Sequence, residues 1–418
     1  MIVPLMEAAA DTCGGKAGAL GVLLRAGLPV PDGFVVPFAA YLDAAGDLGL
    51  GRFAGELSVG RFAGESADLD AARQAIQARP LHATVIDALG RALDGLGDPP
   101  VAVRSSAANE DTGQGSAAGQ YESFLAVHGV GEVADAVRAC WASLLSPRAL
   151  GYRDASGRDD QPLAMAVIVQ RQLDAEVSGV MFTPAGPNDA TEIEASWGLG
   201  PSIVGGTVTP DAYRVAEDGS ITRTVADKRT RLDRHGTRLV VRDVPAHARH
   251  QPTIDDATAT RLAALGKEIA AVLGGPQDIE WAIADGRTWV LQARPVTAAP
   301  PPPPSPSGAS PAALTGTPGS HGTVTGSARI VRGPGDFARV RPGDILVCPF
   351  TDPAWTPLLR IAAGVVTETG GVLSHAAIVA RERAIPAVLG IPNATSRLPD
   401  DAIITIDGTA GTVTATNV

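Results

Sequence analysis

A proline-rich segment near residue 300 limits the architecture of this 418-residue chain more than any other feature. Residues 297–311 read TAAPPPPPSPSGASP, with an unbroken run of prolines from Pro300 to Pro304. Proline fixes φ and lacks the backbone N–H, so this density excludes a helix or an internal strand and favours an extended polyproline II spacer. About fourteen such residues can span ~40 Å. The segment predicts a tether between two domains, with an ordered surface loop as the alternative.

The charge balance limits the class of partner. A net charge of -11 disfavours nucleic acids and anionic membranes, which need clustered positive charge. Apolar runs end well before the ~18 residues of a membrane span, and the first 20 residues lack the basic start of a signal peptide. We therefore expect a cytoplasmic protein with no membrane or nucleic-acid partner. The three distant cysteines indicate neither a disulfide framework nor a zinc site.

Hydrophobic patterning predicts an α+β domain before the tether and a smaller β-rich domain after it. Before the tether, the expected strands are 99–104, 164–170, 177–182, 238–244 and 288–293, and the expected helices are 131–145 and 257–273. After the tether, the expected strands are 323–331, 344–348, 364–367, 387–390 and 402–406, with a helix starting near His375.

The first candidate for binding chemistry is Lys16 in the turn CGGKAGALG. Lysine occurs only at positions 16, 228 and 267, so one placed in a glycine-rich turn is of interest. Backbone N–H groups and one ammonium group beside a helix start can hold a phosphate. The Walker spacing is absent, because Ala17 follows the lysine. An ordinary turn is the alternative.

The second candidate is Arg104, at the end of the apolar strand VAVR and before the polar loop 105–120. A guanidinium group beside hydroxyls and small residues suits bidentate binding of phosphate. The loop could close over a polyphosphate. A structural ion pair is the alternative role for this arginine.

The third candidate is a pair of strands with the sequences QDIEW and VLQARP. Alternating side chains would place Glu280, Gln292 and Arg294 around one point. A carboxylate and an amide oxygen suit Mg²⁺, and Arg294 could neutralise a phosphoryl group in transfer. A surface hairpin with ordinary polar pairs is the alternative.

The fourth candidate is His375 in TETGGVLSHAAIVARE, a histidine in a glycine-rich loop at the start of an apolar helix. Imidazole is a nucleophile that can accept and return a phosphoryl group, and helix N–H groups favour an anion there. A structural histidine is the alternative.

Taken together, these segments resemble the dikinase-like phosphotransferases, which include phosphoenolpyruvate synthase, pyruvate phosphate dikinase and rifampin phosphotransferase. GGKAGALGVLLRAGLPVPDGF, VRSSAANED, GQYESFL, SGVMFTP, GLGPSIVGGTVTPDAY, DIEWA and LQARPVT resemble the ATP-grasp nucleotide domain of that family, and TETGGVLSHAAIVARERAIPAVLGI resembles its swivelling phosphohistidine domain. The implied fold is α+β / α/β, with an ATP-grasp domain over 1–297, a Pro-rich linker over 298–318 and a swivelling phosphohistidine domain over 319–418.

The resemblance also implies cofactors, ATP and Mg²⁺, and a role for each candidate residue. Phosphate contacts are implied for Lys16 and Arg104, the phosphate-covering loop for Gly119 and Ser123, the adenine contact for Gln170, Mg²⁺ binding for Glu280 and Gln292, assistance of transfer for Arg294, and phosphorylation for His375. In relatives, the histidine attacks ATP, AMP leaves, inorganic phosphate is released, and the domain swings to an acceptor.

Two features depart from the family pattern and affect what can be expected. Ala117 stands where phenylalanine is common in the phosphate loop, and Pro201 follows GLG where an acidic residue is common. The residues after the tether match the phosphohistidine domain, so we expect neither a C-terminal pyruvate-binding barrel nor an inserted substrate domain. Pyruvate and phosphoenolpyruvate are therefore not predicted as substrates.

Three functions remain open from the sequence. The leading prediction is an ATP-dependent phosphotransferase that loads His375 and passes the phosphoryl group to a small-molecule acceptor. The second is an ATP-dependent ligase or condensing enzyme that activates its substrate by phosphorylation. The third is a phosphoryl-relay subunit that needs a partner chain carrying the acceptor.

Overall fold

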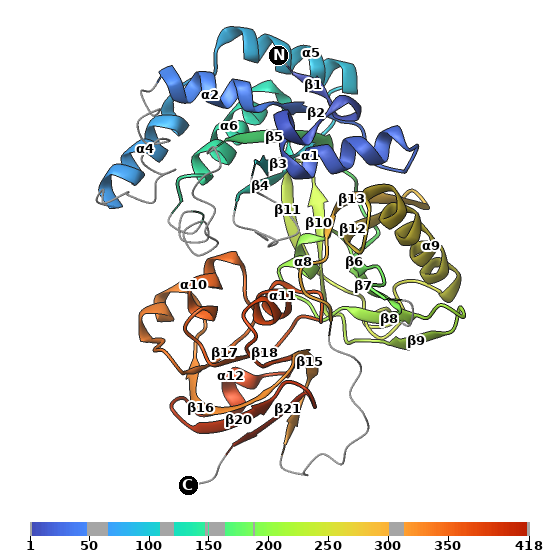
Figure 1. The fold of residues 1–418 in the computed structure, drawn as a ribbon, viewed down its shortest axis with the longest axis vertical. Coiled ribbons are helices and arrows are strands. Elements are labelled where there is room, and N and C mark those ends of the chain that lie inside the picture. Colours follow the sequence, from blue (N-terminus) through green and yellow to red (C-terminus); the bar gives the residue numbers. More distant parts are fainter. Residues whose placement is uncertain are drawn as a thin grey trace. The chain divides into compact units, whose positions relative to one another are not determined.

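The computed structural model describes residues 2–47, 66–108, 121–146, 149, 164–186, 189–300 and 313–415, which form two compact units (Figure 1). Unit 1 contains Met1–Ala175, Asp233–Val240 and Lys267–Pro295; unit 2 contains Glu176–Leu232, Val241–Gly266 and Val296–Val418. Unit 2 combines segments from both sides of the tether, and the domain ranges 1–297, 298–318 and 319–418 stay a prediction. Residues 301–312 of the tether lie outside the described residues. Among the described residues, no helix combines the length and apolarity needed to cross a membrane.

Unit 1 is built on an antiparallel five-stranded sheet of order β1-β2-β5-β3-β4. The central strand β5 has the sequence MAVIVQR, and its first six residues are buried, as expected of a short apolar run in a core. The strands are β1 Val3–Pro4, β2 Gly33–Val36, β3 Val101–Ala107, β4 Ser123–Val127 and β5 Met165–Arg171.

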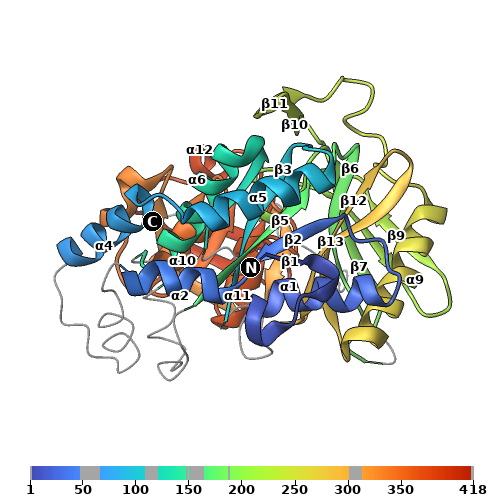
Figure 2. The same ribbon diagram turned by 90° about the horizontal axis from the view of Figure 1, so that it is seen from above.

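Helices surround this sheet, and α1 lies next to the strands that carry the candidate residues. Figures 1 and 2 show α1 beside β2, and it also contacts β3 and β5. Within the described part of the first 175 residues, the helical segments are the 3-10 turn η1 Leu5–Glu7, α1 Ala10–Arg25, α2 Phe38–Asp47, α4 Ser66–Ala78, α5 Ala83–Leu96 and α6 Gly129–Ser143.

A hairpin completes unit 1. Its strands are β12 Gln277–Ala284 and β13 Arg287–Pro295, which pair antiparallel with an irregularity between Glu280 and Trp281. α1 contacts β13, so the hairpin and the five-stranded sheet flank the same helix. Asp285 and Gly286 form the turn with positive φ, which both residue types tolerate.

The first part of unit 2 is an antiparallel run of strands in the order β6-β7-β8-β9. These strands are β6 Val177–Phe182, β7 Thr191–Trp197, β8 Asp211–Val215 and β9 Ile221–Thr224, with the short helix α8 Pro201–Val204 between β7 and β8. Three further elements follow: β10 Thr230–His235, β11 Arg238–Asp243 and α9 Asp256–Leu273. Each of them begins in one unit and ends in the other.

The last part of unit 2 is an eight-stranded sheet of order β14-β21-β20-β16-β17-β18-β19-β15. β16 to β19 pair parallel, and the remaining pairs are antiparallel. The strands are β14 Leu314–Thr315, β15 Thr317–Ser320, β16 Thr323–Ile330, β17 Ile345–Cys348, β18 Gly364–Thr367, β19 Ala387–Leu389, β20 Ile403–Asp407 and β21 Thr412–Ala415. β14 and the start of β15 fall within 298–318, so the sheet begins inside the range assigned to the linker.

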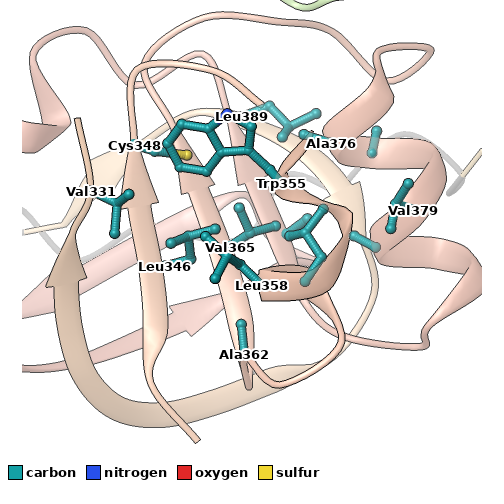
Figure 3. Packing of buried hydrophobic residues seen from close by; sticks show 14 of the residues in the cluster. Val331, Leu346, Cys348, Trp355, Leu358, Ala362, Val365, Ala376, Val379 and Leu389 are labelled. Carbon is teal, nitrogen blue, oxygen red and sulfur yellow. The ribbon is translucent and has the colours of Figure 1, made fainter. Parts of the chain in front are cut away.

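Short helices in this part pack on the parallel strands and enclose an apolar core that contains Trp355. The ring of Trp355 lies among apolar side chains of the sheet and of α11, such as Leu389 and Ala376 (Figure 3). The helical segments are η2 Pro334–Arg339, η3 Pro353–Trp355, α10 Thr356–Leu359, α11 His375–Glu382 and α12 Ala394–Arg397. The helix predicted to start near His375 is thus α11, and the mixed α and β class is confirmed.

Candidate functional site

In unit 1, the Arg104 side chain on β3 reaches both oxygen-bearing residues of the hairpin. Nη2 donates to the Oε2 atom of Glu280 over 3.1 Å and to the Oε1 atom of Gln292 over 2.6 Å. Nη1 donates to the backbone oxygen of Leu291 over 2.6 Å. The arginine is 14% exposed and the glutamate 26%, so this ion pair is partly shielded from water. Three residues singled out from the sequence therefore meet at one guanidinium group.

The register of the hairpin explains why these oxygens lie together. Glu280 is directly opposite Gln292, and Asp278 is directly opposite Arg294, so all four side chains project from one face. Arg294 donates from Nε to the Oδ2 atom of Asp278 over 2.8 Å, and Nη2 lies 2.7 Å from the same oxygen. No role was predicted for Asp278, although it lies two residues before the glutamate, on the same face.

Lys16 is placed by a kink in α1. Gly14 interrupts the helix with φ 82° and ψ 165°, and a Cβ there would lie 2.3 Å from the backbone oxygen of Ser106. The backbone N–H of Ala17 donates to the Oγ atom of Ser106 over 3.1 Å. Ser106 lies two residues after Arg104 on β3, so the glycine turn joins the buried lysine to the strand that carries the arginine.

The remaining predicted nucleotide-binding residues are Ser123, Gln170 and Gly119. Ser123 is exposed at the start of β4 and lies directly opposite Arg104 in the sheet. Gln170 is buried on β5 and donates from Nε2 to the backbone oxygen of Pro31 over 3.0 Å. Gly119 lies outside the described residues. The nucleotide-binding roles of these three residues stay predictions.

In unit 2, His375 is the first residue of α11, after the N-cap residue Ser374. The imidazole is 3% exposed, and hydroxyl groups contact both of its nitrogens. The Oγ1 atom of Thr351 lies 2.9 Å from Nδ1, and the Oγ1 atom of Thr356 lies 3.3 Å from Nε2. Thr351 and Thr356 were missed in the sequence because they precede the histidine by 24 and 19 residues.

A further buried carboxylate, Glu194 on β7, lies against the loop before His375. Its Oε2 atom accepts the backbone N–H of Leu373 over 3.2 Å. Burial raises the pKa of Glu194 from its ordinary value of 4.5 to about 7. The sequence has no local signal for this contact, because the partner of Glu194 lies 179 residues away.

Comparison with known proteins identifies two parts of the chain. Residues 10–305 match the model of the pyruvate phosphate dikinase AMP/ATP-binding domain, and residues 340–411 match the PEP-utilising enzyme mobile domain. The first range includes the hairpin and β3 of unit 1, and the second includes His375.

Named relatives match over both parts. The chain is 38% identical over 415 residues to the "Probable phosphoenolpyruvate synthase" of Methanothermobacter thermautotrophicus, which covers 96% of this chain and 61% of that protein. It is 35% identical over 423 residues to the "Probable phosphoenolpyruvate synthase" of Archaeoglobus fulgidus and 35% identical over 463 residues to the "Phosphoenolpyruvate synthase" of Aeropyrum pernix, with 96% of this chain and 56% of each protein covered. The chain therefore spans little more than half the length of these relatives.

The nucleotide-domain match extends over more than half of the chain, and the mobile-domain match follows it in sequence. The order agrees with the motifs GGKAGALG, VRSSAANED and LQARPVT before the tether and TGGVLSHAAIVARE after it. The chain thus belongs to the family of the pyruvate phosphate dikinase AMP/ATP-binding domain, and it also carries a PEP-utilising mobile domain.

Proposed function

We propose that this chain is a dikinase-type phosphotransferase that uses ATP and Mg²⁺ to phosphorylate His375 and then passes the phosphoryl group to a small-molecule acceptor. The observation that carries the proposal is the convergence of Arg104, Glu280 and Gln292 within the range matched by the AMP/ATP-binding domain. Their segments are separated by more than 170 residues, so the fold, and not chain proximity, assembles this group.

The donor set of the hairpin fits a hard divalent cation. A carboxylate oxygen of Glu280 and the amide oxygen of Gln292 both accept a hydrogen bond from the same Arg104 nitrogen, so the two oxygens lie close together, and Arg104 would release them when a metal ion binds. Oxygen ligands of this kind suit Mg²⁺, which shares them with phosphate oxygens. Glu280 and Gln292 would hold the ion, and bound Mg²⁺ would offset the negative charge of the triphosphate.

Positive side chains of unit 1 are the proposed phosphate contacts. Lys16 and Arg104 are linked through Ser106, which accepts a hydrogen bond from Ala17 next to the lysine. Arg294 is held by Asp278 on the same face as Glu280 and Gln292. Arg294 would offset the charge that builds up as the phosphoryl group leaves AMP.

The environment of His375 supports a nucleophilic nitrogen with a defined proton position. If Nδ1–H donates to Thr351, whose hydroxyl is the nearer of the two, Nε2 carries the lone pair. In the proposed reaction, Nε2 attacks the β-phosphorus of ATP, an N–P bond forms, the bond from this phosphorus to the α-phosphate oxygen breaks, and AMP leaves. Water then removes the γ-phosphate as inorganic phosphate, which leaves one phosphoryl group on the histidine.

The experiment is incubation of the purified chain with Mg²⁺ and ATP labelled at the β-phosphate, followed by nucleotide chromatography. AMP should appear, and the protein should carry acid-labile, base-stable label that ATP labelled at the γ-phosphate does not leave in the final state. His375→Ala should abolish the label while ATP binding stays near normal, because the nucleotide residues are in unit 1. The exposed His321 provides a matched control, and His321→Ala should label normally. Stoichiometric ADP without AMP would exclude the dikinase reaction.

A further inference from the structure

Glu194 is a buried acid that the proposed chemistry does not use. It lies on β7, directly opposite Val180 on β6 and Ala212 on β8, so strands flank it on both sides. Only 2% of the residue is exposed. A carboxyl group at such a position is unfavourable unless it has hydrogen-bond donors.

Those donors come from the loop that leads to His375. The backbone N–H groups of Val372 and Leu373 both point to the Glu194 carboxylate, and the Leu373 N–H is 3.2 Å from Oε2. A Cβ on Gly371 would lie 2.1 Å from Oε1, so glycine is required for this close approach. The acid therefore binds backbone groups two and three residues before the histidine.

Neighbouring contacts extend this polar contact into a small interface within unit 2. The Oγ1 atom of Thr369 donates to the backbone oxygen of Gly206 over 2.6 Å. Around the acid, an apolar cluster joins residues of β6, α8 and the following turn to the histidine loop and α11. Its buried members are Val180, Phe182, Ile203, Val208, Leu373 and Ile378. The interface therefore combines one buried acid with apolar side chains. Separation of the histidine loop from β7 would expose both to water.

We propose that Glu194 is a positioning residue for phosphoryl transfer: it docks the loop that carries His375 on β7, and this contact must break before the histidine can move to its acceptor. The role in phosphoryl transfer rests on the proposed function, but the contact between Glu194 and the histidine loop can be tested without ATP. A carrier that works at two places needs a docked state that is stable and reversible.

The protonation state of Glu194 provides the means of reversal. Loss of solvation raises its pKa to about 7; the N–H groups of Leu373 and Val372 and the charge of Arg381 act in the opposite direction, and Glu192 adds to the rise. Because the docked value lies above 4.5, docking is strongest at low pH, weakens as the pH rises from about 4.5 to about 7, and changes little above that. The difference corresponds to a change in the docking equilibrium on the order of tenfold or more between pH 5.5 and pH 8.

The test is hydrogen–deuterium exchange of the ligand-free full chain at these two pH values, corrected for the intrinsic exchange rates. In the wild type, protection of the Val372 and Leu373 amides should fall by roughly tenfold or more from pH 5.5 to pH 8. Glu194→Gln keeps an acceptor oxygen without the charge, so protection of Leu373 should be the same at both values. Glu194→Ala should lose the protection at both.

Glu217→Gln is the matched control, because it removes the same charge from an exposed position in the turn after β8, away from the Glu194 carboxylate. It should retain the pH dependence of the wild type. If Glu194→Gln has the same pH dependence as the wild type, or if Glu194→Ala remains protected, the inference is wrong. If Glu194→Ala does not fold, the isosteric Glu194→Gln decides alone. Failure of His375 labelling would instead refute the proposed function and leave this result standing.

Discussion

Substitution of Glu280 by glutamine separates its proposed role as a metal ligand from its role in the fold. In the fold, Glu280 accepts one hydrogen bond from Arg104 over 3.1 Å, with 26% and 14% of the two side chains exposed. A charged hydrogen bond contributes about 1.5–3 kcal/mol when shielded, and partial exposure reduces this to about 1 kcal/mol. Glu280→Gln should therefore lower the free energy of unfolding by only about 1 kcal/mol.

The effect on Mg²⁺-dependent ATP binding should be larger. Loss of a residue that only orients a metal ligand typically lowers metal affinity by about 10- to 100-fold, and loss of a charged ligand should reach at least this range. Titration calorimetry with ATP, in Mg²⁺ and in chelator, measures the ratio of the two affinities. This ratio should fall by at least about tenfold in Glu280→Gln, and turnover should be lost.

Asp285 in the turn of the same hairpin offers the control. It is exposed and has φ 52°, a conformation that asparagine also tolerates, so Asp285→Asn removes the same charge without strain. This variant should retain the Mg²⁺ effect of the wild type. An unchanged Mg²⁺ effect in Glu280→Gln, or an equal loss in Asp285→Asn, would place the metal elsewhere.

Three further substitutions address the nucleotide unit and the mobile part. Gly14→Ala should lower ATP affinity, because a Cβ at φ 82° collides with β3. The control Gly95→Ala, whose Cβ meets nothing within 4 Å, should bind ATP normally. Calorimetry measures both affinities, and equal values would refute this role of the kink. Lys16→Ala should weaken ATP binding in the same assay, while Lys267→Ala at an exposed site should not, and a normal affinity of the first variant would remove Lys16 from the phosphate site. Trp355→Ala should destabilise the mobile part by about 3–5 kcal/mol in urea unfolding, and a loss below 1 kcal/mol would contradict its role in the core.

Local patterns in the sequence predicted much of what lies close in the chain or repeats with a strand period. The alternation in QDIEW and VLQARP placed Glu280 and Gln292 on one face, and the structure pairs them directly across the hairpin. The apolar segment after His375 predicted a helix, and the structure has α11 there. Both predictions rest on the geometry of one element or of two elements joined by a short turn.

Contacts between distant segments could not be predicted in this way. Thr351 reaches His375 from a loop after β17, and Glu194 reaches Leu373 across 179 residues, so no period in the sequence relates the partners. The kink at Gly14 could be suspected from paired glycines, but its contact with Ser106 depends on how α1 packs on β3. Such contacts follow from tertiary packing, which is also why β14 could form within a segment assigned to a linker.

The strands β14 and β15 form the two edges of the eight-stranded sheet, where backbone groups can pair with other chains. They stand at opposite ends of the eight-stranded order, yet only Gly316 separates them in the chain. The first and last strands of the sheet order are therefore consecutive in the chain, joined at this residue. An open sheet that travels through solvent would offer unpaired N–H and C=O groups to other chains, and aggregation would follow. β14 and β15 have only two and four residues, and such short edge strands offer few unpaired backbone groups to other chains if this part moves as proposed.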